Sequence, residues 1–208
     1  MQTATISSTM DFENIEAPMT TKAYMMCAFA AFAGILFGYD SGYIASVLGM
    51  DEFKEAYGHL QSVTIDGEVV EMVTYSTWQK ALIVSILSCG TFFGALISGI
   101  LADWLGRRST IILACCVFLA GVIVQLVSLS VAALVVGRLI SGLGVGFISA
   151  VTIMYMSEVA PRNVRGALVS SYQFAITVGI MLASCVGFAT QDRGDTGAFR
   201  VPIGIQML

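Results

Sequence analysis

Residues 109–157 read STIILACCVFLAGVIVQLVSLSVAALVVGRLISGLGVGFISAVTIMYMS and contain a single charged residue, Arg138. One helix of this length would extend about 73 Å, more than twice the hydrocarbon thickness of a bilayer. The stretch must therefore fold back once. The polar triplet at residues 128–130 (Ser-Leu-Ser) predicts the turn, with membrane spans near residues 109–128 and 131–156.

The composition of the whole chain also indicates an integral membrane protein. Of its 208 residues, 57% are hydrophobic and 12% are charged, and this charged share is about half that of soluble domains. A soluble enzyme is therefore excluded, and a net charge of −4 offers no basic surface for nucleic acid. The five cysteines lie in apolar runs and His59 is the only histidine, so we expect no disulfide framework, metal site or cofactor. No pairing of a nucleophile with a base appears in the spans, so we expect no enzyme activity.

Further apolar runs predict spans near residues 23–48, 81–102 and 167–190, and the start of another at residue 200. We therefore expect an all-α membrane protein with five complete spans in residues 23–208. The opening of a sixth span indicates that the sequence is cut off. Residues 1–22 are predicted to be a tail without a cleavable signal, and residues 51–79 an extracellular loop.

The distribution of basic residues predicts the orientation, because cytoplasmic loops of membrane proteins are enriched in lysine and arginine. A cytoplasmic N-terminus puts five basic residues in or beside tight inner turns: Lys22, Arg107, Arg108, Arg162 and Arg165. The outer side then holds four, Lys54, Lys80, Arg193 and Arg200. The density of charge in the inner turns favours this orientation, and the plasma membrane is the expected location.

Residues 51–79 carry six acidic residues and one lysine, which makes an acidic outer loop. Within it, residues 65–68 (Ile-Asp-Gly-Glu) suit the turn of a short β-hairpin. An isolated hairpin is only marginally stable. We therefore expect a mobile loop here, with the hairpin as the alternative.

Glycines recur at intervals of four residues in three of the predicted spans. Small residues let helix backbones approach closely in lipid, where no hydrophobic force drives helices together. These stripes predict close helix packing, and they would also suit helices that slide or rock against one another. The stripes are Gly34, Gly38 and Gly42; Gly90 and Gly94; and Gly142 and Gly146.

Two ionisable residues lie inside predicted spans, Asp40 in the first and Arg138 in the fourth. Both lie roughly 10–15 Å below the outer surface if each residue rises about 1.5 Å. An acid and a base at matching depth can pair, which lowers the cost of each charge in the membrane. A carboxylate that changes protonation when this pair breaks is what a proton-coupled carrier needs. A purely structural buried salt bridge is the alternative.

Two predicted inner turns carry matched sets of acidic and basic residues. Asp103 and Glu158 each follow a span, where the helix dipole disfavours a negative charge and a basic partner is required. The available partners are Arg107, Arg108 and Arg165. This pattern predicts a salt-bridge latch that closes one end of a carrier, and ordinary loop charge is the alternative.

Two glutamines also lie within spans. Gln173 is about two turns into the fifth span, and its amide could bind a polyhydroxylated ligand or form an interhelical hydrogen bond. Gln125, late in the third span, is expected to form an interhelical hydrogen bond.

Six motifs, in order, resemble the sugar porters of the major facilitator superfamily. They are Gly38-Tyr39-Asp40-Ser41-Gly42; Gly99-x3-Asp103-x2-Gly106-Arg107-Arg108; Gly137-Arg138-x3-Gly142-x-Gly144-x-Gly146; Glu158-x2-Pro161-x3-Arg165-Gly166; Gln173 with Gly179; and Arg200-x-Pro202-Ile203-Gly204-x-Gln206. Together with residues 14–18 and the acidic loop, they are most similar to fungal high-affinity glucose and monosaccharide transporters.

The resemblance implies the N-terminal six-helix half of a twelve-span fold, with its sixth helix truncated and its C-terminal half as partner. It implies that Asp40 accepts a proton with Arg138 as its modulating partner, and that Phe37 and Gln173 contact the sugar. It further implies an inner gate formed by Asp103, Arg107, Arg108, Glu158 and Arg165. The implied function is monosaccharide transport, with glucose:proton symport foremost. The alternatives are a carrier of the same fold for quinate or another small polar solute, a sugar sensor that does not transport, and a truncation product without function.

Overall fold

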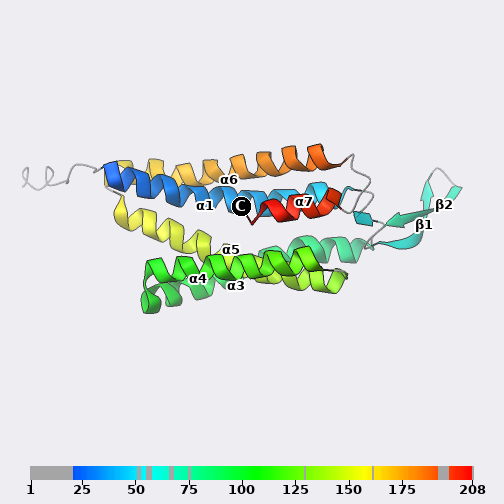
Figure 1. Cartoon of the computed structure of the whole chain (residues 1–208), viewed down its shortest axis with the longest axis horizontal. Helices are drawn as coiled ribbons and strands as arrows, with labels where there is room; N and C mark the ends of the chain where they lie inside the picture. The colour runs from blue at the N-terminus through cyan, green and yellow to red at the C-terminus, as the bar shows by residue number, and fades with distance from the viewer. Residues whose placement is uncertain are drawn as a thin grey trace, which may run out of the picture.

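A computed structural model describes residues 21–50, 53–54, 58–65, 68–74, 76–128, 130–160, 162–191 and 197–207. Long helices lie side by side along one axis, with two strands at one end (Figure 1). The elements in chain order are α1 (Thr21–Val47), β1 (His59–Ile65), β2 (Glu68–Thr74), α3 (Thr77–Leu105), α4 (Arg107–Val127), α5 (Val131–Val159), α6 (Arg162–Thr190) and α7 (Gly197–Ile205). The predicted tail falls almost entirely on residues 1–20, which lie outside the described residues.

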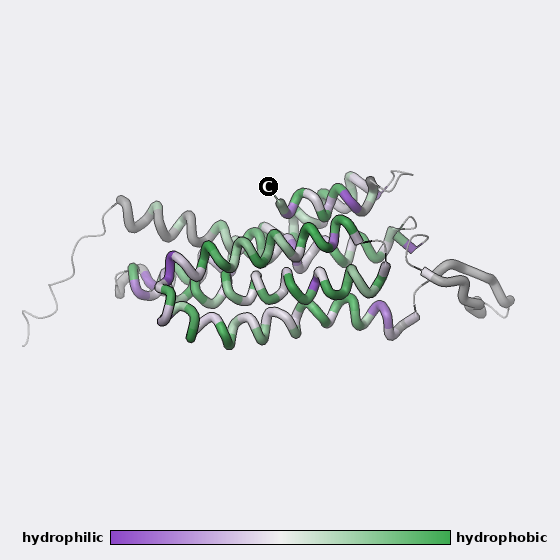
Figure 2. The backbone as a smooth tube through the Cα atoms, turned by 60° about the horizontal axis from the view of Figure 1, so that its bottom comes forward, coloured by the Kyte–Doolittle hydropathy of each residue, from purple (hydrophilic) through white to green (hydrophobic). Residues whose placement is uncertain are grey.

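Four helical segments among the described residues are long and apolar enough to cross a membrane: Trp78–Leu105, Arg107–Val127, Val131–Val159 and Arg165–Thr190. Hydrophobic residues dominate the lengths of the helices, and hydrophilic residues gather mainly near their ends (Figure 2). A helix satisfies its backbone hydrogen bonds internally, which the bilayer core requires of any spanning segment. The chain is therefore a multi-pass membrane protein.

The turns between successive helices are short and specified locally. The break between α4 and α5 lies at the polar triplet, where the Ser130 side chain caps α5 by accepting a hydrogen bond from the backbone N–H of Ala133 at 3.3 Å. Between α3 and α4 the only intervening residue is Gly106, with a φ of 82°. This left-handed conformation is strained for residues that carry a Cβ, so glycine permits the abrupt reversal.

The glycine stripes lie where helices pack most closely. α1 packs along α6, while α5 lies between α3 and α4 and also reaches α1. A Cβ added to Gly90 would lie 2.6 Å from the backbone oxygen of Leu139, and one on Gly142 would lie 2.7 Å from that of Leu87. The prediction of close helix packing is confirmed. Sliding of these helices stays a prediction.

The segment before α3 contains a β-hairpin that lies beyond the end of the bundle (Figure 1). β1 and β2 are antiparallel, with His59 opposite Thr74 and Ile65 opposite Glu68. The expectation of a mobile loop is therefore wrong for residues 59–65 and 68–74, because backbone pairing between the strands fixes their register. The two residues of the predicted turn, Asp66 and Gly67, lie outside the described residues.

Candidate functional site

Asp40 on α1 is completely buried inside the bundle. Its Oδ1 accepts a hydrogen bond of 3.0 Å from the Nε2 amide of Gln206, the residue that follows α7. Its other oxygen, Oδ2, has no hydrogen-bond partner. Because a buried carboxyl group is costly unless its oxygens are satisfied, this residue is a candidate for a functional role.

Arg138 on α5 is also buried, with 1% of its surface exposed. Its Nη1 donates a hydrogen bond of 2.9 Å to the hydroxyl of Tyr43. The guanidinium carbon lies 5.4 Å from the centroid of the Tyr43 ring, within the range of a cation–π interaction. Nε and Nη2 have no hydrogen-bond partner.

The predicted direct pairing of Asp40 with Arg138 is wrong for this structure. Both residues are in the described part of the chain, and no carboxylate oxygen of Asp40 lies within 4.0 Å of a guanidinium nitrogen of Arg138. Each charged group is held instead by a neutral one, Gln206 for the acid and Tyr43 for the base. The two charges are therefore buried in the same region without forming an ion pair.

Tyr43 and Gln206 are the residues of this cluster to which the sequence analysis gave no role. Tyr43 lies three residues after Asp40, so the two side chains share a helix face. That spacing was the available signal for Tyr43. For Gln206 the signal was its place in the last of the six motifs, although nothing in the motif indicates its partner on α1.

Gln125 forms the interhelical hydrogen bonds that the sequence predicted. Its Oε1 accepts from the hydroxyl of Tyr43 at 2.6 Å, and its Nε2 donates to the hydroxyl of Ser141 at 2.9 Å. It thereby links α4 to both α1 and α5. The glutamine is 1% exposed, so these bonds satisfy polar atoms that water does not reach.

The predicted latch brings together three of its five residues, at the end of the bundle opposite the hairpin (Figure 1). Arg107 at the start of α4 contacts Asp103 near the end of α3, with 2.8 Å between Nη1 and Oδ1. It also contacts Glu158 near the end of α5, with 2.9 Å between Nη2 and Oε1. The side chains of Arg107 and Glu158 are 29% and 47% exposed, so water screens the ion pairs of this cluster and weakens them.

The other two residues of the predicted latch do not join this cluster. Arg165 donates from Nη2 to the backbone oxygen of Ala160 at 3.4 Å. Arg108 is exposed and lines a cavity. The gate role of all five residues stays a prediction.

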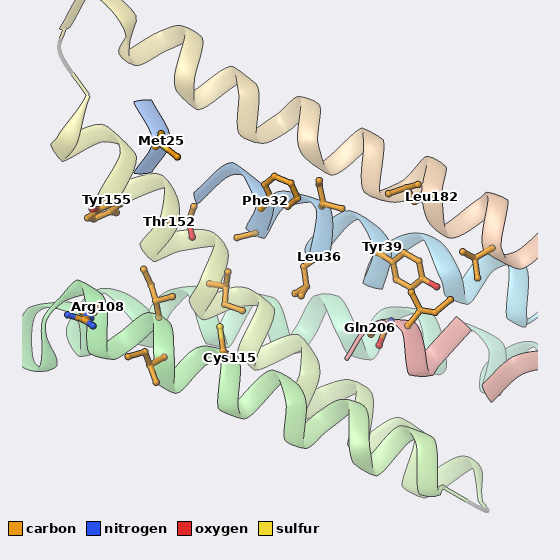
Figure 3. Close-up of a pocket in the computed structure, with 17 residues that line it drawn as sticks. Met25, Phe32, Leu36, Tyr39, Arg108, Cys115, Thr152, Tyr155, Leu182 and Gln206 are labelled. Atoms are coloured by element: carbon orange, nitrogen blue, oxygen red, sulfur yellow. The ribbon is translucent and has the colours of Figure 1, made fainter. Parts of the chain in front are cut away.

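The cavity has a volume of about 1180 Å³ and lies among α1, α4, α5, α6 and α7. Tyr39 and Gln206 lie near one end, and Arg108 and Tyr155 near the other (Figure 3). The walls between are mostly apolar, with Phe32 and Leu36 among them. An apolar surface of this kind suits a hydrophobic segment better than a sugar, which needs converging polar groups.

The predicted sugar contacts, Phe37 and Gln173, are not among the residues that line this cavity. Phe37 is half-buried and packs against a cluster of Met156, Tyr172 and Ile176. The side chain of Gln173 on α6 is exposed. Neither residue therefore lines this cavity, and their contact with a sugar stays a prediction.

Comparisons with known proteins identify relatives along most of the chain. It is 42% identical over 184 residues to the major facilitator-type transporter ecdD of Aspergillus rugulosus, covering 88% of this chain and 33% of that relative. It is 42% identical over 179 residues to the high glucose sensor RGT2 of Saccharomyces cerevisiae, covering 86% and 22%. It is 39% identical over 191 residues to the probable glucose transporter rco-3 of Neurospora crassa, covering 92% and 31%. The chain thus spans about a third or less of the length of these relatives.

Among solved structures, the inward open conformation of the xylose transporter XylE from E. coli matches with a TM-score of 0.72 at 24% identity, covering 89% of this chain and 45% of that chain. The predicted helical fold of a major facilitator superfamily half is confirmed. The family model described as "Sugar (and other) transporter" matches residues 26–208. Because this match covers more than half of the chain, the protein belongs to the sugar (and other) transporter family.

Proposed function

We propose that the chain is part of a carrier that moves a monosaccharide, glucose foremost, across the plasma membrane together with a proton. The carrier alternates between two access states and binds the sugar between this part and a second half. The observation that carries the proposal is Asp40, a carboxyl group buried in a membrane bundle with one oxygen unpartnered. Buried acids of this kind mark ion and proton pathways in membrane proteins.

In this proposal Asp40 takes up and releases the proton, and Arg138 is the buried charge that influences it. Phe37 and Gln173 contact the sugar, which the partner half completes. The end cluster of Asp103, Arg107 and Glu158 helps to close the cytoplasmic side, and the N-terminus lies in the cytoplasm. The names of the relatives support glucose as the substrate, since several of them are glucose or hexose transporters.

A sugar sensor is the second candidate, and the relative RGT2, named a high glucose sensor, favours it. A sensor would bind sugar and change conformation without moving the sugar across the membrane. The relative ecdD is named only as a major facilitator-type transporter. It therefore leaves open a carrier for quinate or another small polar solute, which competition between unlabelled solutes and labelled glucose would identify.

The test uses a fused carrier, in which residues 1–208 are joined to the part of rco-3 that follows the aligned segment. It is expressed in cells that lack their own sugar transporters. We expect concentrative glucose uptake that rises as the external pH falls. Asp40→Asn should abolish this pH-dependent accumulation, while exchange of sugar across preloaded vesicles continues at least in part.

Glu71→Gln is the matched control, because it neutralises an acid on β2, in the hairpin beyond the end of the bundle. It should keep the pH dependence. Accumulation by Asp40→Asn with an unchanged pH profile would contradict proton coupling through Asp40. Sugar binding without uptake or exchange by the unmodified fused carrier would favour the sensor.

A further inference from the structure

A closed ring of hydrogen bonds begins and ends on Arg138. Its Nη1 donates to the hydroxyl of Tyr43 at 2.9 Å. That hydroxyl donates to Gln125, the amide of Gln125 donates to the hydroxyl of Ser141, and this hydroxyl donates to the backbone oxygen of Arg138 at 3.2 Å. Three helices, α1, α4 and α5, contribute to the ring, and all four residues are at most 1% exposed.

The direction of each bond in the ring is fixed by chemistry. A guanidinium group only donates, and the Oε1 of a glutamine only accepts. The single hydroxyl proton of Tyr43 must therefore point to Gln125, which leaves an oxygen lone pair for Arg138. In this orientation the amide nitrogen of Gln125 donates to Ser141, which leaves the hydroxyl proton of Ser141 for the backbone oxygen of Arg138.

Two glycines bring the helices close enough to form this ring. A Cβ added to Gly137 would lie 2.7 Å from Cγ of Gln125. One added to Gly121 would contact the backbone of Ser141, with 2.8 Å to its Cα. Since neither position has room for a side chain, α4 and α5 meet at the level of the ring.

We propose that Tyr43, aligned by Gln125 and Ser141, is a positioning residue that holds the Arg138 guanidinium apart from the Asp40 carboxyl group. In this arrangement Asp40 is bound by the neutral amide of Gln206 and keeps one oxygen free to exchange a proton. Its link to transport rests on the proposed function. The arrangement of the side chains does not.

Removal of the Tyr43 hydroxyl should redirect Arg138. Nη1 of Arg138 then loses its partner, and Nε and Nη2 have none already. The charged group facing Asp40 from α5 is Arg138, and the titratable groups beside it on α1 are Tyr39 and Tyr43. α7 contributes the neutral amide of Gln206, and α6 packs against this part of α1 through apolar residues around Ile180 and Ala183. Arg138 should therefore turn to Asp40 and stabilise its charged form.

The test measures the protonation of Asp40 directly in the 208-residue chain, reconstituted in lipid nanodiscs. Infrared difference spectra record the C=O stretching band of a protonated carboxyl group, and the component lost in Asp40→Asn is assigned to Asp40. In Tyr43→Phe the pH at which half of this band is lost should fall by at least about one unit, a tenfold change in proton affinity.

Tyr39→Phe is the matched control. Tyr39 stacks on Tyr43 with 6.3 Å between ring centroids, but its hydroxyl donates to the backbone oxygen of Pro202 instead of binding Arg138. This variant should leave the midpoint of the Asp40 band in place. An unchanged midpoint in Tyr43→Phe, or an equal change in both variants, would overturn the proposal.

Gln125→Leu is the second variant, in case Tyr43→Phe does not insert or fold. It removes the acceptor that aligns the Tyr43 hydroxyl, so the midpoint of the Asp40 band should fall by less than it does in Tyr43→Phe. An unchanged midpoint would count against the proposal. The absence of an Asp40 band at any accessible pH in the unmodified chain would also contradict it, because the acid would then be permanently paired. If the midpoints shift as expected while the fused carrier with Asp40→Asn keeps pH-dependent accumulation, the positioning role stands and proton symport fails.

Discussion

Substitution of Gly38 by alanine tests the packing of α1 against α6. The added Cβ would contact the carbonyl oxygen of Ile176 and would lie 2.8 Å from its carbonyl carbon and 3.0 Å from its Cα. All three atoms belong to the α6 backbone, which cannot move aside as a flexible side chain can. The two helices must therefore separate or shift along one another.

The expected cost can be worked out from two opposing effects. Overpacking a well-packed interface costs about 1–3 kcal/mol, and a clash with backbone belongs at the upper end of this range. Alanine regains about 1 kcal/mol of helix propensity over glycine. The net loss is therefore about 2 kcal/mol, which lowers the melting temperature by about 4–8 °C for a chain of this length.

Gly99→Ala is the control, because a Cβ at this position in α3 meets no atom within 4 Å. This variant should gain from propensity alone and melt at or slightly above the temperature of the unmodified chain. The measurement is thermal unfolding of the purified chain in detergent, followed by the loss of helical circular dichroism. Equal melting temperatures for the two variants would refute the reasoning, because the same chemical change would then be insensitive to the nearness of α6.

Three further predictions concern the ends of the helices and use the same chain or the fused carrier. Glu158→Gln removes one of the two partners of Arg107. Labelling of a cysteine introduced at that end of the empty fused carrier should therefore rise, while the melting temperature changes little. Unchanged labelling with normal uptake would mean that these charges serve only as topology signals. Ser130→Ala removes the cap of α5 and should lower the free energy of unfolding by about 1 kcal/mol. The melting temperature should then fall by about 2–4 °C. An unchanged melting temperature would show that water replaces the cap. Gly106→Ala forces a Cβ into the left-handed conformation and should lower the free energy of unfolding by about 1–2 kcal/mol. The same melting assay measures this loss. A stability equal to that of Gly99→Ala would argue against strain at this turn.

The helical architecture could be predicted because a bilayer imposes length and polarity on every spanning segment. The run of residues 109–157 was too long for one span, and its serines marked the break that the structure contains between α4 and α5. The hairpin was predicted only as the alternative to a mobile loop, although its strands do pair up to Ile65 and Glu68, the ends of the proposed turn. Its two short strands lie outside the bundle, where no comparable constraint on length applies.

The buried cluster was predicted only in part. Sequence reasoning identified Asp40 and Arg138 because a charge inside a span is conspicuous, and their depth was predicted by counting residues. It could not show that Arg138 is bound by Tyr43 and not by the acid. Partner choice depends on side-chain distances of a few ångströms between helices, and residue counting does not resolve these.

The hydrogen bonds of the cluster also bear on the order in which the protein assembles. The partner of Asp40 on the α7 side lies 166 residues later in the sequence, and Arg138 lies 95 residues after Tyr43. During synthesis α1 must therefore enter the membrane long before either contact exists. Until residue 206 leaves the ribosome, the acid lacks its amide partner and α1 lacks its contacts with α7. Early pulse-labelled chains should accordingly show α1 more accessible to water than the finished protein does.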